Sequence, residues 1–326
     1  MQFPKFLQEK DTIGITAPSC GVGDDLVSFD KSLDNLKKDY KVIETKSVRN
    51  KGYVSAPAKE RAKELDQLII DKEVSMIICA SGGDFLLDML PYVNWNHIKE
   101  NPKWVMGYSD PTTLLFTITT KLDIATIYGC NAGSFDQTIL HKSLQNNLEI
   151  LKGNIIKQES YPYYQKERIE GMDGYHLTEK VYWKTPNGKV DVKGRLIGGC
   201  LDSLKDILGT PFDYTQEFIK KYQKDGIIWY FDIFSKSAEE VYITLFQMQQ
   251  AGWFQHIKGI IVGRVCFPQG FYPDFSYEQA FQKLFPNLPI ILNADIGHVP
   301  PKMTLINGSL AHITCENGKG AIEQKL

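Results

Sequence analysis

The first half of the chain alternates short apolar runs with longer segments in which apolar residues recur every three or four positions. A short apolar run bounded by Gly or Pro predicts a buried strand, and the three-to-four spacing predicts an amphipathic helix. Their alternation indicates a parallel sheet covered by helices, of the flavodoxin-like kind. The expected strands are 12–17, 41–44, 74–80, 103–106 and 124–128, and the expected helices are 26–36, 58–71 and 112–121.

The second half has a different organisation. Residues 156–190 are rich in Tyr, Lys, Glu and Gly and predict a connector or hairpin segment. Asn307 and Gly308 separate two short apolar runs and predict a β-hairpin. We therefore expect an N-terminal α/β domain at 1–155, the connector, and a mixed α/β, β-rich C-terminal domain at 191–326. Strands are expected there at 192–198, 226–234, 257–265, 289–294, 304–307 and 310–314, and helices at 238–251 and 277–284.

Charge and composition exclude several classes of function. The 326-residue chain has a formal net charge of −2 with both signs interspersed, so neither nucleic acid nor an anionic membrane is an expected partner. No apolar run approaches the roughly 20 residues of a membrane span, and the N-terminus lacks the build of a signal peptide, so we expect a cytoplasmic protein. The six cysteines form no CxxC pair and HExxH is absent. We therefore expect reduced thiols, no metal and no cofactor.

One serine falls at an abrupt junction between a strand and a helix. The strand 103–106 ends at Gly107, and Pro111 suits the first turn of the next helix. Ser109 is therefore expected in a tight turn beside free backbone N–H groups, which is a geometry that suits a nucleophile. The competing interpretation is that Ser109 and Asp110 cap the helix.

The loops that follow successive parallel strands meet at the carboxyl edge of the sheet. This places the Gly82–Gly83 pair near Ser109, although a Gly-Gly pair alone is more often an ordinary turn. Cys79 and Cys130 are rival nucleophiles on the same edge. Buried cysteines at strand ends are usually inert, so the serine is the better candidate.

Further landmarks occur in order along nearly the whole chain, and with them the chain resembles the LD-carboxypeptidase family of serine peptidases, which includes the microcin C self-immunity proteins. The landmarks are Gly14–Pro18, Gly52-Tyr53, Glu60-Arg61, Ser81–Gly83, Gly107–Asp110, Gly194–Gly199, Leu208–Thr210, Gly297-His298 and Pro301–Leu305.

The resemblance implies a Ser–His–acid triad that cleaves an amide next to a free carboxylate. Ser109 matches the nucleophile and His298 the general base, a role that suits a side chain whose unperturbed pKa is near 6.5. A glycine of the Gly82–Gly83 pair and the backbone N–H of Asp110 match the oxyanion hole. Without this context, a histidine that simply ends a strand would be the better interpretation of His298.

The acid is where the sequence departs from the family. The family has a glutamate at the end of an apolar strand, and this chain has Asp232 at that position. Aspartate orients the catalytic histidine in unrelated serine hydrolases. Its side chain is one methylene shorter, about 1.5 Å, so the backbone has to compensate. Glu239 and Glu240 are alternatives, but we expect them on the solvated face of the following helix.

The resemblance leaves two substrates open. One branch of the family removes the terminal D-amino acid from cytoplasmic muropeptides, and the other cleaves the amide of microcin C-type peptide-nucleotides. Trp183 is a candidate for stacking on a nucleobase, and Arg195 and Lys302 are candidates for binding the substrate carboxylate. The competing interpretations are a half-buried hairpin tryptophan and structural ion pairs.

The partners expected are therefore a small peptide or muropeptide and, from the resemblance, a second copy of the chain in a homodimer. A function of a different class also fits the sequence. In this alternative the protein binds such ligands without turnover, because Asp232 does not replace the family glutamate.

Overall fold

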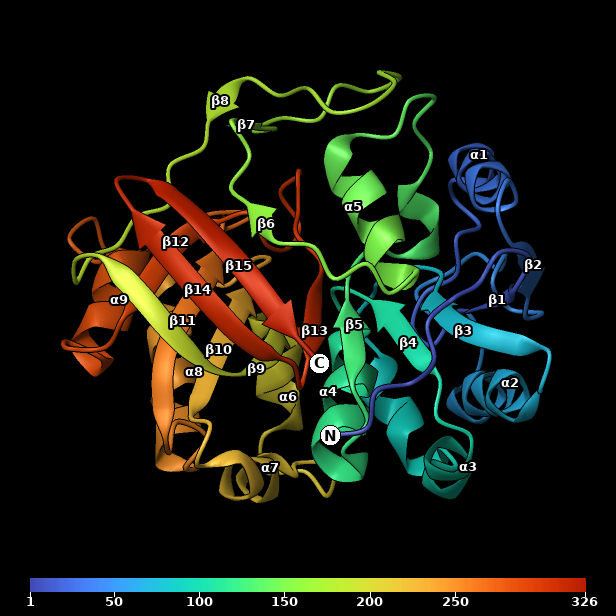
Figure 1. Cartoon of the computed structure of the whole chain (residues 1–326), viewed down its shortest axis with the longest axis horizontal. Helices are drawn as coiled ribbons and strands as arrows, with labels where there is room; N and C mark the ends of the chain where they lie inside the picture. Colours follow the sequence, from blue (N-terminus) through green and yellow to red (C-terminus); the bar gives the residue numbers. More distant parts are fainter.

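The computed structural model describes residues 1–326 and contains two main sheets that lie side by side (Figure 1). The first sheet has the order β13-β5-β4-β3-β1-β2, in which β1 to β5 are parallel and β13 is antiparallel to β5. The order of its parallel strands is that of flavodoxin-like folds, as the sequence predicts. Its strands are β1 (Thr12–Thr16), β2 (Lys41–Glu44), β3 (Val74–Cys79), β4 (Trp104–Gly107), β5 (Thr126–Tyr128) and β13 (Leu305–Asn307).

The helices of this half are amphipathic except for one. Helix α1 buries Phe29, Leu33 and Leu36 and begins at Asp25, whose side chain accepts the N–H of Ser28. Helix α4 is buried along most of its length because it packs against both halves of the molecule. The helices are α1 (Leu26–Leu36), α2 (Ala58–Ile70), α3 (Trp95–Glu100), α4 (Thr112–Leu122), α5 (Lys142–Leu151) and two 3₁₀ helices, η1 (Leu86–Tyr92) and η2 (Ala132–Ser134).

The second sheet is mixed and has the order β12-β11-β10-β9-β14-β15-β6. Strands β9 to β12 are parallel, and the strands from β14 to β6 continue the sheet in antiparallel fashion. The strands are β9 (Val190–Cys200), β10 (Ile227–Asp232), β11 (Ile257–Gly263), β12 (Ile290–Ala294), β14 (Leu310–Glu316), β15 (Lys319–Lys325) and β6 (Gln158–Glu159); the helices are α6 (Leu201–Ile207), α7 (Thr215–Tyr222), α8 (Ala238–Gln250) and α9 (Tyr277–Leu284).

The hairpin predicted at Asn307 and Gly308 is wrong. Strand β13 pairs with β5 of the first sheet, whereas β14 pairs with β9 of the second, so this turn carries the chain from one sheet to the other. The hairpin lies one turn later, between β14 and β15, where Asn317 and Gly318 have φ angles of 52° and 80°. Two successive positive φ values are the signature of the tight turn that suits twisted strands.

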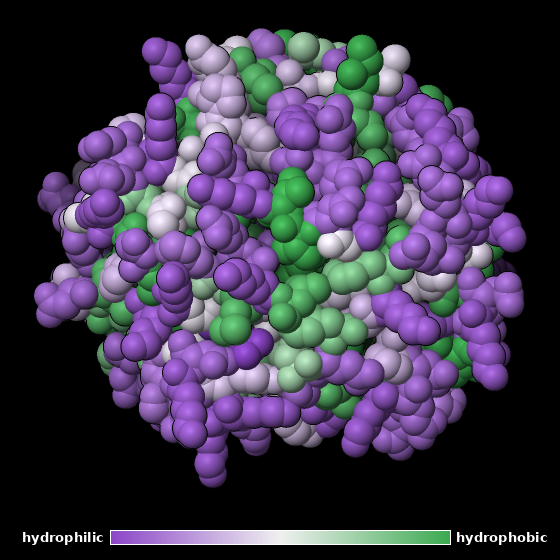
Figure 2. Space-filling view, viewed as in Figure 1, coloured by the Kyte–Doolittle hydropathy of each residue, from purple (hydrophilic) through white to green (hydrophobic).

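The two halves share buried apolar residues. One hydrophobic cluster contains Ile77 and Val105 from the first sheet together with Leu196 and Ile228 from the second. The face seen in Figure 2 is mostly hydrophilic, with a narrow strip of hydrophobic residues along the junction between the sheets. No helix has the length and apolar character needed to cross a bilayer.

The segment between the halves forms a small hairpin of its own. Strand β7 (Tyr163–Tyr164) pairs with β8 (Glu179–Lys180), and the chain between them extends over α5 at the top of the view in Figure 1. Its tip is tied to α1 by the ion pair of Lys31 and Asp173 at 2.8 Å. The segment also contacts the start of α5, where the ring of Tyr175 lies 5.3 Å from that of His141.

Candidate active site

Ser109 lies in a strained turn between β4 and α4. Its φ angle is 69°, a value that is uncommon for a residue other than glycine and is found most often at functional sites. The turn can be this tight because residue 107 is a glycine: a Cβ there would lie only 2.8 Å from Cβ of Pro111. The backbone carbonyl of Ser109 accepts the N–H of Thr112 at 2.9 Å. The hydroxyl of Ser109 therefore projects from the turn, next to the start of α4.

The capping interpretation of this turn is wrong. Helix α4 begins after Pro111 without a side-chain hydrogen bond to its first N–H groups. The carboxylate of Asp110 faces the other way and accepts the hydroxyl of Ser19 and, at 2.9 Å, the N–H of Leu86. Asp110 ties the serine turn to the loops that follow β1 and β3.

Three side chains from distant parts of the sequence meet at the serine. Ser109 Oγ lies 3.0 Å from Nε2 of His298, and Nδ1 of His298 lies 2.7 Å from Oδ2 of Asp232. His298 follows β12, and Asp232 ends β10, so this row crosses the junction between the two halves. The side chain of His298 is 11% exposed and that of Asp232 is fully buried. We call these three residues the relay.

Aromatic rings hold the imidazole in place. The ring of His298 lies 5.1 Å from that of Tyr108 and 4.6 Å from that of Phe234, measured between centroids. Phe234 in turn packs edge-on against Phe267 at 5.1 Å, and both rings are partly exposed. The exposed Phe234–Phe267 pair therefore forms part of the wall beside the histidine.

The backbone compensates for the shorter acid. Gly297 has a φ angle of 91°, and a Cβ at this position would lie only 1.9 Å from Oδ1 of Asp232. The N–H of His298 donates to the same oxygen at 3.3 Å. A glycine thus lets the histidine loop rest directly on the aspartate.

The contact between His298 and Asp232 is short but poorly aligned for a hydrogen bond. Nδ1 and Oδ2 are within 2.7 Å, yet the Nδ1–H bond is not directed at that oxygen as a hydrogen bond requires. The two side chains meet as a close ion pair, whose alignment falls short of the linear contact usual in triads. The 2.7 Å separation still pairs the two side chains, because catalytic contacts of this kind are often poorly aligned before a substrate binds.

The carboxylate of Asp232 is held in its ionised form. Burial raises the pKa of Asp232, but His298, the hydroxyl of Tyr128 and the ammonium of Lys302 together lower the pKa below its usual range. The alternative acids are elsewhere. Glu240 closes the capping box of α8 with Ser237, and Glu239 accepts backbone N–H groups of the loop at 271–272.

Free backbone donors surround the serine. A Cβ at Gly82 would lie 3.0 Å from Ser109 Oγ, and one at Gly83 would lie 2.3 Å from Oγ of Ser19. These glycines therefore pack directly against the serine turn and its neighbouring loop. The N–H groups of Gly82, Gly83 and Asp110 donate to no other atom of the chain. Such unpaired N–H groups can stabilise an oxyanion.

Two predicted substrate-binding residues are wrong. Trp183 is fully buried, and its Nε1 donates to Oδ2 of Asp295 at 3.0 Å, so its ring is not accessible to a nucleobase. Arg195 pairs with Asp225 at 2.5 Å and lies over the ring of Tyr222. It lies opposite the first residue of β10, about 16 Å of strand away from Asp232 at its other end.

Lys302 does lie near the relay. Its Nζ is 3.1 Å from the centroid of the Tyr108 ring, and no carboxylate lies within ion-pair distance. The residue is 8% exposed.

The rival nucleophiles are buried thiols: burial raises the pKa of Cys79 to about 12 and also raises the pKa of Cys130. Both remain protonated near neutral pH and are poor nucleophiles.

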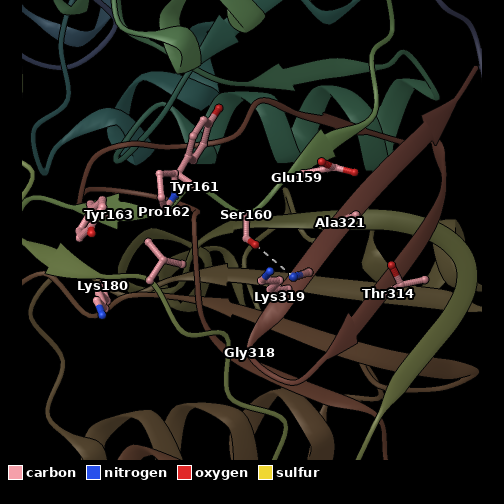
Figure 3. Close-up of a pocket in the computed structure, with 12 residues that line it drawn as sticks. Glu159, Ser160, Tyr161, Pro162, Tyr163, Lys180, Thr314, Gly318, Lys319 and Ala321 are labelled. Atoms are coloured by element: carbon pink, nitrogen blue, oxygen red, sulfur yellow. Dashed lines mark hydrogen bonds between the residues drawn. The ribbon is translucent and has the colours of Figure 1, made fainter.

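A cavity of about 610 Å³ lies elsewhere, between the connector and the β14–β15 hairpin (Figure 3). It is lined by residues such as Ser160, Tyr163 and Lys319, and no residue of the relay reaches it. The cavity is therefore separate from the candidate site formed by Ser109, His298 and Asp232.

A serine, a histidine and a buried carboxylate in a row beside free N–H groups define a hydrolase-like site on an α/β fold. The comparison with family models gives the class directly. Residues 13–129 match the LD-carboxypeptidase N-terminal domain, and residues 193–313 match the LD-carboxypeptidase C-terminal domain. The chain belongs to the LD-carboxypeptidase family, which is a family of peptidases.

Two curated relatives represent the two branches of this family. The chain is 26% identical to the Bacillus subtilis protein named "Probable murein peptide carboxypeptidase", over 98% of this chain and 94% of that protein. It is also 26% identical to the Escherichia coli microcin C7 self-immunity protein MccF, over 89% of this chain and 86% of MccF. A structure of MccF in complex with aspartyl sulfamoyl adenosine superposes with a TM-score of 0.83 at 22% identity, covering 100% of this chain and 99% of that one. This structural likeness confirms the expected fold class.

Proposed function

We propose that this protein is a serine carboxypeptidase that cleaves an amide bond near a free carboxylate through an acyl-enzyme. One observation carries the proposal: Ser109 Oγ lies 3.0 Å from His298 Nε2, and His298 Nδ1 lies 2.7 Å from a fully buried Asp232. A nucleophile, a base and an orienting acid in that order are the requirements of nucleophilic acyl transfer.

The reaction follows from the position of each group. His298 Nε2 accepts the proton of Ser109 as Oγ attacks the amide carbon, and the oxyanion is held by N–H groups of Gly82, Gly83 and Asp110. The C–N bond then breaks, and His298 returns the proton to the leaving amine. Water attacks the resulting ester by the same path and releases the acid. Asp232 orients the imidazole and stabilises its charged form.

We propose a muropeptide as the first substrate class, with release of a terminal D-alanine in the cytoplasm during peptidoglycan recycling. The name of the Bacillus subtilis relative supports this choice. A terminal D-amino acid carries a free carboxylate next to the scissile amide. Lys302 is a cation without an ionic partner beside the relay, and it is our candidate for binding that carboxylate.

The second candidate substrate is a peptide-nucleotide of the microcin C type. The observation that favours it is the exposed Phe234–Phe267 pair, which packs against His298. The leaving amine has to depart past His298, because this residue protonates it. A planar leaving group could stack on the pair there, and the MccF structure with aspartyl sulfamoyl adenosine makes such a substrate reasonable.

A third possibility is that the protein binds these ligands without turnover. The observation in its favour is that the Nδ1–H bond of His298 is not directed at Asp232. Under this alternative the protein would retain its affinity for ligands while Ser109 would not react.

A single parallel assay distinguishes the three. Purified wild-type protein and the variant Ser109→Ala are incubated with a murein tetrapeptide and with aspartyl sulfamoyl adenosine, and products are followed by mass spectrometry. Release of D-alanine or of aspartate by the wild type alone supports the peptidase and identifies the branch. Equal activity of both proteins would refute the role of Ser109, and binding by calorimetry without any product would establish the non-catalytic alternative.

A further inference from the structure

Tyr128 contacts both the acid and the backbone of the nucleophile. Its hydroxyl donates to Oδ2 of Asp232 at 2.6 Å, and the backbone N–H of Ser109 donates to this hydroxyl at 3.4 Å. A phenol can donate its one proton and accept another at the same time, so the two contacts are compatible. Tyr128 therefore connects the two ends of the relay along a path that does not pass through His298.

The sheet fixes the position of this hydroxyl. Tyr128 is the last residue of β5 and pairs with Gly107 of β4. The residue is buried, and its ring lies 5.4 Å from that of Tyr230 and 6.5 Å from that of Tyr108. The hydroxyl is thus a donor whose place is set by the packing of the fold and not by the relay itself.

We propose that Tyr128 is a positioning residue of the relay, which holds Oδ2 of Asp232 beside His298 and couples that carboxylate to the turn that carries Ser109. This inference rests on the proposed function of the relay. The need for such a residue follows from the geometry. Asp232 has a shorter side chain than the family glutamate, and the N–H of His298 Nδ1 is not directed at Oδ2. Tyr128 supplies the side-chain hydrogen bond that fixes this oxygen.

Outside the relay itself, Tyr128 is the one side chain that donates a hydrogen bond to Asp232. Apart from Tyr128, the donors that reach the carboxylate of Asp232 are the backbone N–H and Nδ1 of His298. The titratable groups that face Asp232 from the surrounding elements are Tyr128 on β5, Tyr230 on β10, Cys200 at the end of β9, Cys266 after β11, and His298 and Lys302 after β12. Lys302 is the only permanent cation among them, and removing the hydroxyl leaves it in place.

Loss of the hydroxyl has a definite consequence for the pH dependence. An ionised carboxylate that loses a charge-assisted hydrogen bond becomes more basic. The pair of His298 and Asp232 then takes up a proton at higher pH, and the relay is inactivated sooner as the pH falls. A residue that only filled space would leave this limb of the profile unchanged.

Tyr230 provides a matched control. It is as deeply buried as Tyr128, lies next to it, and donates its hydroxyl to Oδ1 of Asn307 at 2.9 Å. The same Asn307 oxygen also accepts the N–H of Gly198 at 3.1 Å, so it keeps a partner when the Tyr230 hydroxyl is removed. Tyr230→Phe therefore removes a buried phenol hydroxyl near the relay without removing a donor to Asp232.

The test measures the rate at which a fluorophosphonate labels Ser109 between pH 5 and 9, because labelling reports the relay without a known substrate. For Tyr128→Phe we expect a fall of at least ten-fold in the rate at neutral pH and an upward shift of about one pH unit in the acid limb. For Tyr230→Phe we expect a rate within two-fold of the wild type and no shift. Absence of labelling in the wild type would overturn the proposed function instead.

Two outcomes would overturn the inference while leaving the proposed function intact. The first is wild-type labelling together with equal rates and equal acid limbs in both variants. The second outcome applies if circular dichroism shows that Tyr128→Phe does not fold, and it comes from a different protein. A fluorotyrosine placed at residue 128 of the full chain keeps the shape and is a stronger donor, so its acid limb should move to lower pH. An unmoved limb in that protein would contradict the role of Tyr128.

Discussion

Gly297 offers the sharpest test of how the aspartate is accommodated. A Cβ at this position would lie 1.9 Å from Oδ1 and 2.1 Å from Cγ of Asp232, whereas ordinary contacts begin at 3.4 Å. Gly297→Ala therefore has to move the carboxylate or the histidine loop by about 1.5 Å, and a displacement of 1 Å in a catalytic group can lower a rate about 100-fold. We expect a fall of at least 100-fold in kcat/KM or in the labelling rate of Ser109.

The control separates this clash from backbone strain. Gly188 has a φ angle of 90°, nearly equal to the 91° of Gly297, and a Cβ there would meet nothing within 4 Å. Both alanine variants should lose about 1–2 kcal/mol of stability from the positive φ angle, and Gly297→Ala should lose more because its Cβ also clashes with Asp232; denaturant unfolding measures both losses. Only Gly297→Ala should lose activity. Activity of that variant within three-fold of the Gly188→Ala protein would refute the close packing of the loop on Asp232.

Three further predictions concern the acid, the cation and the aromatic wall. Asp232→Asn should lower kcat at least 100-fold because the imidazole loses its orienting partner. In the wild type, the stability contributed by this carboxylate should persist above about pH 4 and be lost as the pH falls further, because the pKa of Asp232 is lowered in the folded state. Equal changes of the melting temperature with pH in the wild type and in the variant would contradict this. Lys302→Met should raise KM about ten-fold for a substrate with a free carboxylate and leave a carboxamide analogue unaffected, and equal losses for both would exclude direct recognition. Phe234→Ala should impair cleavage of aspartyl sulfamoyl adenosine more than release of D-alanine, which a comparison of kcat/KM for the two substrates would decide.

The periodicity of the sequence predicts most of the first sheet because a buried parallel strand and an amphipathic helix have distinct repeats. It fails where a turn signal does not specify a partner. Asn307 and Gly308 do mark a turn, but only the packed structure shows that β13 joins the first sheet. The sequence does not predict strand β15 because its alternation of apolar and polar residues is weak; the strand forms by pairing with β14 through the turn at Asn317.

The candidate nucleophile and the candidate base could be located from the sequence because turn residues and family landmarks mark Ser109 and His298, which the structure brings together. Tyr128 could not, since a tyrosine at the end of an apolar strand looks like an ordinary core residue. Trp183 shows the opposite case: its polar sequence surroundings predict an accessible ring, but the residue is buried and donates to Asp295. The role of Gly297 likewise depends on the approach of a distant strand, which no local pattern records.

The central claim is that His298 activates Ser109 for covalent catalysis. Peptide-level mass spectrometry after treatment with a fluorophosphonate tests it most directly, with His298→Gln as the comparison. The account predicts one adduct, on the peptide that contains Ser109, in the wild type and a loss of that adduct in the variant. An unlabelled wild-type serine, or equal labelling of both proteins, would contradict it.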